Sequence, residues 1–416
     1  MNDKDTKVPE IRFQGFTDAW EQRKLGEDIK FVGGATPFKA NSEYWNGDIV
    51  WLSSQEIKES FVTSGTYKIT KKAVQDNATK VIKAGTPLIV TRSGILAKRF
   101  PISIPTVDVA INQDIKALIY DNERIRTDFL VAGIQRNEGF ILKYIVKSGT
   151  TVQSISLPDF QKFLMSYPML SEQIAIGNFF RILDDAITLH KRKLDGLKEL
   201  KRGYLQRMFP QAGQSVPQVR LAGFTEPWQK RLLGDVVDRV TRKNKGLEST
   251  LVLTISAQHG LIAQKDFFDK EVASKDVSNY YLVKNGEFAY NKSYSNGYPW
   301  GAIKRLDNYE IGVLSTLYIV FKPTNIDSEF LTQYYETTYW HNEVSQYAAE
   351  GARNHGLLNI STSDFFDTVL TIPTDSDEQA TIGNFFRMLD GQIITQKQKL
   401  SQIKQLKSAY LQKMFI

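Results

Sequence analysis

The sequence predicts a mixed α/β (α+β) protein that is built twice. We expect two bodies of strands and short helices, and two long helices that form an antiparallel coiled coil with a pseudo-two-fold axis. Two observations predict this plan. GNFFRILD at 177–184 returns as GNFFRMLD at 383–390, and VPEIRFQGFTDAWEQRKLGE from Val8 returns as VPQVRLAGFTEPWQKRLLGD from Val216. Internal similarity of this length indicates a duplicated architecture.

The composition is that of an ordinary globular protein. The chain has 416 residues, 42% hydrophobic and 24% charged, which is enough for two or three domains. It has no cysteine, so disulfides and thiolate sites are excluded. We find neither a signal peptide nor a run of about 18 apolar residues, and we expect a cytoplasmic protein with no membrane association. The net charge of +7 favours anionic partners.

The two halves share their frames but not their interiors. Residues 172–209 and 378–415 agree at about 22 of 38 positions without a gap, and SISLPDF from Ser154 is echoed by NISTSDF from Asn359. The first body (28–153) and the second body (236–358) differ almost completely. This contrast predicts one scaffold that displays two recognition surfaces. The predicted domains are 1–166, 167–210, 211–371 and 372–416.

The repeated segments predict two long helices with matching apolar seams. They lack proline and are rich in good helix formers. Heptad spacing places polar residues at His190, Lys201, Gln396 and Lys407 within each seam. The apolar seam residues are Leu183, Ile187, Leu194, Leu197, Tyr204, Met208, Leu389, Ile393, Leu400, Ile403, Tyr410 and Met414.

One antiparallel register aligns these seams along their full length. The expected pairs are Leu194–Ile403, Leu197–Leu400, Ile187–Tyr410, Tyr204–Ile393, His190–Lys407 and Lys201–Gln396. This register confines the polar groups to two layers, which would fix the pairing. The alternative is that each helix is buried separately within its own half. Phe179, Phe180, Phe385 and Phe386 lie outside the seam, and they either pack beneath the bodies or dock helices of another subunit.

The bodies have the same predicted order of elements. Strands are expected at 48–54, 86–93 and 107–120, with a helix near 126–146, and again at 250–256, 286–293 and 311–321, with a helix near 328–348. SLPD at 156–159 and STSD at 361–364 resemble capping boxes that begin short helices. Trp20 and Trp228, in the repeated opening segments, are interpreted as core anchors.

These motifs carry a resemblance to a known family. The opening segment from Val8, GGATPFKANSEYWNGDIVWLSSQEI from Gly33 and the doubled EQxxIGNFFRxLD…LKxxYLQ(K/R)MF resemble the specificity (S) subunit of type I restriction–modification systems, in the family's order. The resemblance implies two target recognition domains, at 1–166 and 211–371. Each would bind one half of a split, asymmetric double-stranded DNA target. It also implies two conserved helical regions, at 167–210 and 372–416, that form an antiparallel coiled coil.

The resemblance also implies partners. Two methyltransferase (M) subunits would bind the helices and methylate adenine at N6 with S-adenosylmethionine. Restriction (R) subunits would add ATP-dependent translocation and cleavage, with ATP and Mg²⁺ on those partner subunits. The S subunit itself would carry no catalytic site, cofactor or metal.

The motifs of an enzyme are missing from the sequence. There is neither an Asn/Asp-Pro-Pro-aromatic loop for a flipped base nor a GxxxxGK[ST] nucleotide loop. FVGGAT at 31–36 lacks a GxG and is interpreted as a turn after a strand. The four histidines have no zinc-ligand spacing.

Polar residues at predicted strand ends are the candidate DNA-binding residues, because Arg and Lys suit guanine while Asn and Gln suit adenine. In the first body they are Ser53, Gln55, Arg92, Ser93, Lys98, Arg99, Asn112, Gln113 and Thr150. In the second body they are Gln258, His259, Asn291, Lys292, Ser293, Tyr294, Arg353, Asn354 and His355. Two alternatives remain: a self-contained DNA methyltransferase or nuclease, and a coiled-coil scaffold whose heads bind protein and not DNA.

Overall fold

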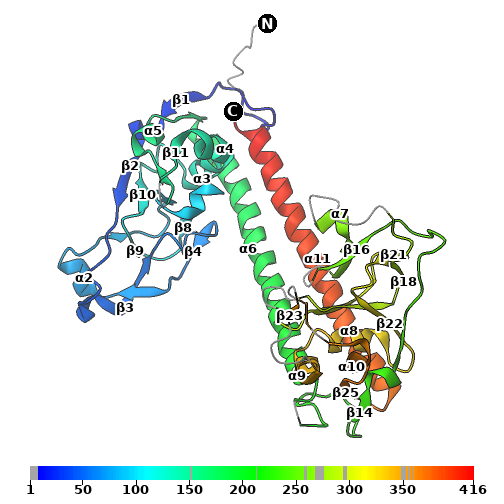
Figure 1. The fold of residues 1–416 in the computed structure, drawn as a ribbon. Coiled ribbons are helices and arrows are strands. Elements are labelled where there is room, and N and C mark those ends of the chain that lie inside the picture. Colours follow the sequence, from blue (N-terminus) through cyan, green and yellow to red (C-terminus); the bar gives the residue numbers. More distant parts are fainter. Residues whose placement is uncertain are drawn as a thin grey trace. The chain divides into compact units, whose positions relative to one another are not determined.

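A computed structural model describes residues 8–149, 152–211, 213–256, 260–267, 276–293, 298–347, 353–354, 357–358 and 360–416 (Figure 1). The fold is mixed α+β. The chain divides into two compact units, one formed by residues 1–193 with 396–416 and the other by residues 194–395. Each unit therefore contains one body and parts of both long helices.

The first body is built on two sheets. A five-stranded sheet has the order β2-β10-β7-β8-β4, and a four-stranded sheet has the order β5-β3-β9-β6. Apolar side chains of both sheets share one core, which includes Leu52, Val90 and Ile111. The strands are β2 (Lys30–Gly33), β3 (Trp45–Leu52), β4 (Phe61–Val62), β5 (Tyr67–Ile69), β6 (Val81–Ile82), β7 (Leu88–Val90), β8 (Ile102–Pro105), β9 (Val109–Ile111) and β10 (Ile115–Ile119).

Short elements complete the first unit. They are β1 (Glu21–Lys24), α1 (Leu25–Asp28), η1 (Ser42–Tyr44), α2 (Lys71–Gln75), η2 (Gly94–Ala97), α3 (Thr127–Arg136), α4 (Glu138–Phe140), η3 (Ile141–Ile145), β11 (Val146–Lys147), β12 (Ser154–Ile155), α5 (Leu157–Gln161) and β13 (Leu164–Tyr167). Strands β1 and β13 pair antiparallel, which ties the opening segment to the approach of the long helix.

The second unit repeats this plan. Its sheet β15-β22-β19-β20 is joined by the pairs β14–β25, β16–β17, β18–β21 and β23–β24. The strands are β14 (Gln229–Leu232), β15 (Val237–Arg239), β16 (Leu253–Ser256), β17 (Gly260–Ala263), β18 (Tyr281–Lys284), β19 (Phe288–Asn291), β20 (Ala302–Arg305), β21 (Ile311–Leu314), β22 (Ile319–Pro323), β23 (Arg353–Asn354), β24 (Leu357–Leu358) and β25 (Val369–Ile372). The helices are η4 (Leu233–Asp235), α7 (Gln264–Phe267), α8 (Ser328–Tyr334), α9 (Tyr339–Tyr347) and α10 (Thr362–Phe366).

Two of the predicted strands and both body helices are broken in the structure. Residues 107–120 form β9 and β10, which belong to different sheets, and 311–321 span β21 and the start of β22. The break in the first body is a turn in which Asn112 Oδ1 accepts a hydrogen bond from Asp114 N at 3.1 Å. The predicted helix near 126–146 is divided into α3, α4 and η3, and the one near 328–348 into α8 and α9.

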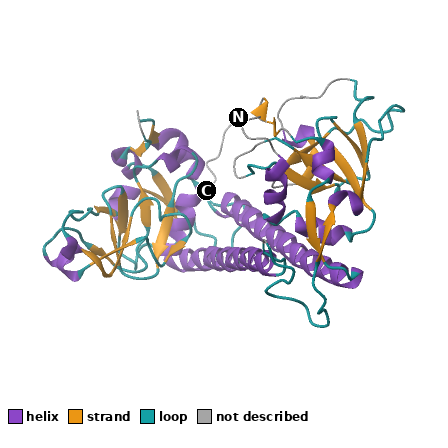
Figure 2. Ribbon diagram, turned by 60° about the horizontal axis from the view of Figure 1, so that its bottom comes forward, coloured by secondary structure: helices purple, strands orange, loops and turns teal. Residues whose placement is uncertain are grey.

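The long helices are α6 (Leu170–Arg207, green in Figure 1) and α11 (Ser376–Met414, red), each drawn as one unbroken helix in Figure 2. In the first unit, the rings of Phe179 and Tyr410 lie 5.0 Å apart, and Gln396 Nε2 donates to His190 O at 3.1 Å. As the residue numbers rise along α6, from Phe179 to His190, the residue numbers of their contacts in α11 fall, from Tyr410 to Gln396. The helices therefore run antiparallel in this unit.

The second unit has the equivalent contacts. The rings of Tyr204 and Phe385 lie 5.0 Å apart, and Lys201 Nζ lies 2.7 Å from Asp390 Oδ1. The residue numbers again change in opposite directions, so α6 and α11 are antiparallel here as well. Because the two helices contact each other within each unit, the alternative of separately buried helices is wrong.

The predicted register is wrong by about one heptad. In the first unit, Lys407 meets Asp184 rather than His190, and Tyr410 meets Phe179 rather than Ile187. An apolar pattern with a seven-residue period pairs almost equally well when one helix is shifted by seven residues. The pattern alone therefore could not choose between the two registers. The carboxylate that neutralises Lys407 decides the register, and it lies outside the predicted seam.

The same shift holds in the second unit. Lys201 meets Asp390 rather than Gln396, and Tyr204 meets Phe385 rather than Ile393. None of the twelve apolar seam residues is exposed. Leu194, Met208, Leu389, Ile393, Leu400 and Met414 are buried, and Leu183, Ile187, Leu197, Tyr204, Ile403 and Tyr410 are half-buried.

Two of the four phenylalanines lie in the cores of the units. Phe180 and Phe386 are 1% and 0% exposed. They therefore pack beneath the bodies, as one of the two alternatives predicts, and are not accessible for docking to another subunit. Phe179 and Phe385 are half-buried. The interpretation of Trp20 and Trp228 as core anchors is confirmed, since both are 3% exposed and each packs edge-on against a phenylalanine at a long-helix end.

The helix starts after SLPD and STSD differ in detail. Ser361 makes a full capping box with Asp364 at the start of α10. Ser156 precedes α5 without capping it through its side chain. Within the described ranges, no helix has the length and apolar character needed to cross a membrane.

Candidate nucleic-acid interface

Loops that follow four strands of the first body meet at one edge. Backbone hydrogen bonds join them: Asn112 N donates to Leu52 O at 3.0 Å, and Thr91 N donates to Asp114 O at 2.7 Å. The hydroxyl of Thr36 donates to Gln113 Oε1 at 2.9 Å. We call the polar residues gathered here the loop edge: Thr36, Ser53, Gln55, Arg92, Ser93 and Gln113.

Glycine allows the loop after β2 to approach this edge. A Cβ atom at Gly34 would lie 1.8 Å from the carbonyl oxygen of Ile111, at the end of β9. Any other residue would therefore displace the backbone. FVGGAT, interpreted as a turn after a strand, contains the end of that strand, because β2 runs to Gly33, and the loop that follows carries Thr36.

Three loop-edge side chains are exposed: Gln55, Arg92 and Gln113. Arg92 forms a backbone bridge with Ser154, which fixes its Cα, and its guanidinium has no ion-pair partner among the described residues. A guanidinium matches the acceptors of guanine, and Gln suits adenine. These side chains are exposed at strand ends, and the sheets hold their backbone.

The two serines of the loop edge are engaged locally. The Ser53 hydroxyl donates to the Glu56 carboxylate, and Ser93 Oγ accepts from Ile95 N at 3.4 Å, at the start of η2. Burial raises the pKa of Glu56, but hydrogen bonds from Ser53 and Thr66 outweigh this effect and the pKa is lowered. A charged Glu56 therefore anchors the loop that carries Gln55.

Two predicted DNA-binding residues have structural positions instead. Asn112 is only 6% exposed and bonds to both the backbone and the side chain of Asp114, so the prediction that it reads a base is wrong. Arg99 Nη2 donates to the carbonyl oxygens of Lys58 at 2.8 Å and Ile57 at 3.3 Å, so it is not a free reader either. Lys98, at the end of η2, is exposed.

The second body brings part of its predicted set together. Asn291 ends β19, and its Oδ1 accepts from Ser293 N at 3.0 Å. Lys292 Nζ donates to Ile360 O at 3.1 Å, while Lys292 O accepts from Leu358 N at 3.0 Å. Leu358 pairs with Arg353, so the β23–β24 hairpin lies beside the end of β19.

The remaining predicted positions are Thr150, Gln258, His259, Tyr294 and His355, which lie outside the described residues. The backbone of Arg353 and Asn354 is described, but their side chains are not. Thr36 belongs to the loop edge and was missed by the sequence analysis. The sequence feature that could have indicated Thr36 is its position just after the predicted strand and the two glycines of FVGGAT.

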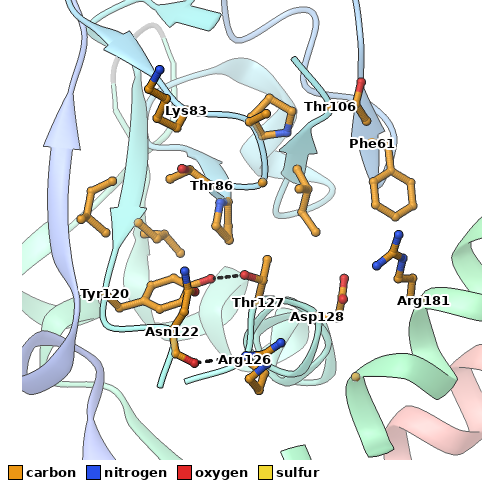
Figure 3. A pocket seen from close by; sticks show the side chains of 18 of the residues that line it. Phe61, Lys83, Thr86, Thr106, Tyr120, Asn122, Arg126, Thr127, Asp128 and Arg181 are labelled. Atoms are coloured by element: carbon orange, nitrogen blue, oxygen red, sulfur yellow. Dashed lines mark hydrogen bonds between the residues drawn. The ribbon is translucent and has the colours of Figure 1, made fainter. Parts of the chain in front are cut away.

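A cavity of about 840 Å³ lies at the other end of β10, against the starts of α3 and α6 (Figure 3). Tyr120 donates to Thr127 Oγ1 at 2.9 Å, and burial raises the pKa of Tyr120 to about 12. Burial also raises the pKa of Asp128, against the opposing charge of Arg181.

No group of three His, Asp or Glu side chains among the described residues could hold a metal ion.

Comparisons with known proteins agree with the resemblance read from the sequence. Residues 17–199 match the family model "Type I restriction modification DNA specificity domain". The chain is 36% identical over 178 residues to the Escherichia coli type I restriction enzyme EcoR124I/EcoR124II specificity subunit, covering 42% of this chain and 43% of that protein. The chain thus spans less than half of the length of that relative.

Two further likenesses extend over most of the chain. The Methanocaldococcus jannaschii type I restriction enzyme MjaVIII specificity subunit is 22% identical over 363 residues, covering 82% of this chain and 80% of that protein. A crystal structure of a type I restriction–modification system S subunit from M. genitalium has a TM-score of 0.61 at 14% identity, covering 98% of this chain and 99% of that one. The fold is therefore similar to that of this S subunit. The match to the specificity-domain model covers residues 17–199, which is less than half of the chain.

Proposed function

We propose that this chain is the sequence-specific DNA-recognition subunit of a type I restriction–modification complex. It reads a bipartite, asymmetric target with two target recognition domains, 1–166 and 211–371. The observation that carries the proposal is the loop edge, where Gln55, Arg92 and Gln113 are exposed on a rigid sheet frame. The specificity-domain match over residues 17–199 supports it.

The helical segments 167–210 and 372–416 serve as the spacer between the two recognition domains. They contain α6 and α11, and the antiparallel contacts within each unit support a coiled coil. Such a coiled coil would carry unlike bodies at its two ends, and unlike bodies require unlike half-sites. The exposed parts of these helices would also bind two methyltransferase subunits.

The chain contributes recognition and assembly, and its partners contribute chemistry. Methyltransferase subunits would use S-adenosylmethionine to methylate adenine, and restriction subunits would use ATP and Mg²⁺ to translocate and cleave DNA. Within the first body, Gln55, Arg92, Lys98 and Gln113 are the proposed readers. Within the second, the set is Asn291, Lys292, Ser293 and the β23–β24 hairpin. Four positions outside the described residues, Gln258, His259, Tyr294 and His355, are further members of this set, and Thr150 is a further member of the first.

Binding of cognate duplex by the complex with methyltransferase subunits tests this function. Arg92→Ala should weaken cognate binding by about 1–3 kcal/mol, the value of one good side-chain contact to a base. Lys198→Ala, on the exposed face of α6, should change it little. Equal losses in both variants would contradict the assignment of the loop edge.

The same preparation separates the two alternatives. If the purified chain alone binds S-adenosylmethionine, it is a self-contained methyltransferase. If the complex shows no salt-dependent affinity for duplex DNA, the chain is a protein-binding scaffold, because phosphate contacts always make DNA binding weaken with salt.

A further inference from the structure

A second cavity in the first unit lies where the first body meets both long helices. It has a volume of about 450 Å³. Lys58 and Arg99 line it from the first body, Arg136 from the end of α3, and Lys404 and Lys407 from α11. Five cations therefore surround one small space, and we call this cavity the basic groove.

Three carboxylates also line the basic groove, but each is already engaged. Asp184 is paired with Lys407 at 2.6 Å. Glu138 Oε1 accepts a hydrogen bond from Phe100 N at 2.7 Å, and Glu59 forms an ion pair with a lysine of α6. Asp184 and Glu59 are thus neutralised within the protein, and Glu138 leaves one negative charge beside the four cations that form no ion pair.

The other cations of the groove lack such partners. Lys58, Arg136 and Lys404 form no ion pair or side-chain hydrogen bond among the described residues, and Arg99 uses only one of its nitrogen atoms, on two carbonyls. The Nε atoms of Arg99 and Arg136 are buried without an acceptor. A buried donor without a partner destabilises the folded protein, so an anion that enters the groove and accepts a hydrogen bond from it would remove that cost.

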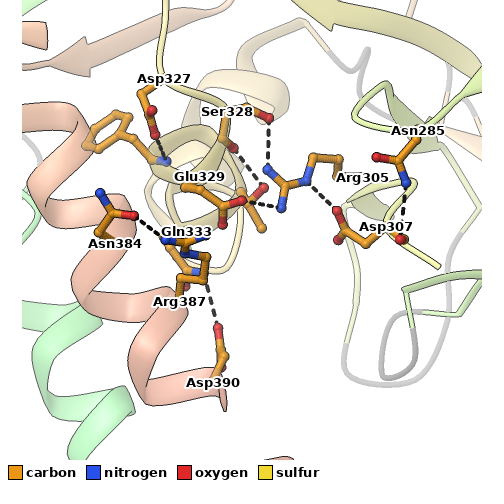
Figure 4. Close-up of polar contacts among 12 residues, drawn as sticks. Asn285, Arg305, Asp307, Asp327, Ser328, Glu329, Gln333, Asn384, Arg387 and Asp390 are labelled. Atoms are coloured by element: carbon orange, nitrogen blue, oxygen red, sulfur yellow. Dashed lines mark hydrogen bonds and ion pairs between the residues drawn. The ribbon is translucent and has the colours of Figure 1, made fainter. Parts of the chain in front are cut away.

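In the equivalent cavity of the second unit, the cations are neutralised by carboxylates of the protein itself. It also has a volume of about 450 Å³ and is lined by Lys201, Lys304 and Arg305. Lys201 pairs with Asp390 at 2.7 Å. Arg305 pairs with Asp307 at 2.6 Å and with a glutamate of α8 (Figure 4). Lys304 pairs with a glutamate just after α8. Each of these three cations thus has a carboxylate partner within the protein.

We propose that the basic groove binds a backbone phosphate of the DNA whose bases the loop edge reads. This inference rests on the proposed function. Lys58 lies three residues beyond Gln55, and three residues span at most about 10 Å, so a duplex seated on the loop edge brings its backbone near the groove. Guanidinium groups bind phosphate through paired N–H donors, and Arg136 offers an unused one. The second unit has no such site in its equivalent cavity, so the two half-sites are held unequally.

Salt titration of DNA binding tests the proposal with the complex of the full chain and its methyltransferase subunits. The variant is Lys58→Gln with Arg136→Gln and Lys404→Gln, and Arg136→Gln alone serves as the milder form. Each lost phosphate contact should make the slope of log affinity against log salt about 0.9 shallower. Affinity should fall about tenfold or more, alike for the cognate duplex and for one with altered half-sites. Thermal melting checks that each variant folds.

Lys198→Gln is the matched control. Lys198 occupies the position in α6 that Lys404 occupies in α11, and it is exposed outside the basic groove. Its replacement should leave the salt slope unchanged. An equal change of slope in this control would mean a general charge effect and would overturn the site.

Three other outcomes overturn the proposal. If the triple variant keeps the wild-type slope and affinity while cognate preference persists, the groove does not bind phosphate and the proposed function stands. If it loses cognate preference alone, the groove reads bases. If it binds DNA normally once assembled but assembles poorly with methyltransferase subunits, the groove holds an acidic protein segment. A wild-type complex that binds no duplex refutes the proposed function itself.

Discussion

The Nζ atom of Lys407 lies 2.6 Å from Oδ1 and 2.7 Å from Oδ2 of Asp184, and both side chains are 10% exposed. Lys201 makes the same contact with Asp390 at 2.7 and 2.8 Å. Asp184 and Asp390 hold equivalent positions in the repeat, as do Lys201 and Lys407. Each unit is thus closed by the same ion pair, between the start of one long helix and the end of the other.

Removing one partner of the buried pair should be costly. Lys407→Met leaves the charge of Asp184 buried without a counterion, and such losses amount to about 3–5 kcal/mol. Lys201→Met should cost less, because Asp390 is 35% exposed and also accepts a hydrogen bond from Gln333. Urea unfolding of both variants measures the difference. Asp184→Leu combined with Lys407→Met should recover most of the loss, and no recovery would contradict this account.

Engineered disulfides report the helix register. The natural chain has no cysteine, so introduced pairs are read without interference. His190→Cys with Gln396→Cys should cross-link, since these residues are in contact. His190→Cys with Lys407→Cys should not, because 407 lies about 16 Å further along α11 and a disulfide needs Cα atoms within about 7 Å. Gel mobility with and without reductant distinguishes the two, and preferential bonding of the second pair would refute the register.

The repeat made the frame of this protein predictable from the sequence. The two long helices and the buried Trp20 and Trp228 followed from segments that recur almost unchanged. The register did not follow, because a heptad pattern looks the same after a shift of seven residues. Contacts such as Lys407–Asp184 and Lys201–Asp390 separate the two registers, and these contacts are tertiary.

The sequence predicted those positions of the candidate site that depend on local features, namely polar residues at the ends of strands. Arg92 and Gln113 lie at strand ends and are exposed, as expected. The burial of Asn112 does not follow from the sequence, because the pattern predicts one strand over 107–120, whereas the structure has a turn in which Asn112 bonds to Asp114. The basic groove could not be foreseen, since Lys58 and Lys404 meet only after the chain ends have folded together.

Arg92 and Arg99 should behave differently when each is replaced by alanine. Arg99→Ala frees the carbonyls of Ile57 and Lys58 and should lower the free energy of unfolding by about 1–3 kcal/mol. Arg92→Ala should change it by no more than about 0.5 kcal/mol, because the side chain is exposed. Thermal melting compares the two. A larger stability loss in Arg92→Ala would show that Arg92 is structural rather than a reader.

Asp128 should make stability depend on pH. Burial raises its pKa above the ordinary value of 3.8, so the folded state disfavours the carboxylate. The penalty is complete above the raised pKa and disappears as the pH falls below 3.8. Asp128→Asn should therefore melt at a higher temperature than the wild type at pH 7, and the gap should close on acidification. Glu123→Gln, at an exposed position, is the control and should show no such gap.

The central claim is that two unlike bodies read two unlike parts of one DNA target. Mapping methylated adenines across the genome of cells that carry this chain and its methyltransferase subunits tests it most directly. We predict a two-part, non-palindromic target with an unspecified spacer, and Arg92→Ala should relax the sequence of one part only. A palindromic or single-block target, or methylation that is unchanged when this chain is deleted, would contradict the account.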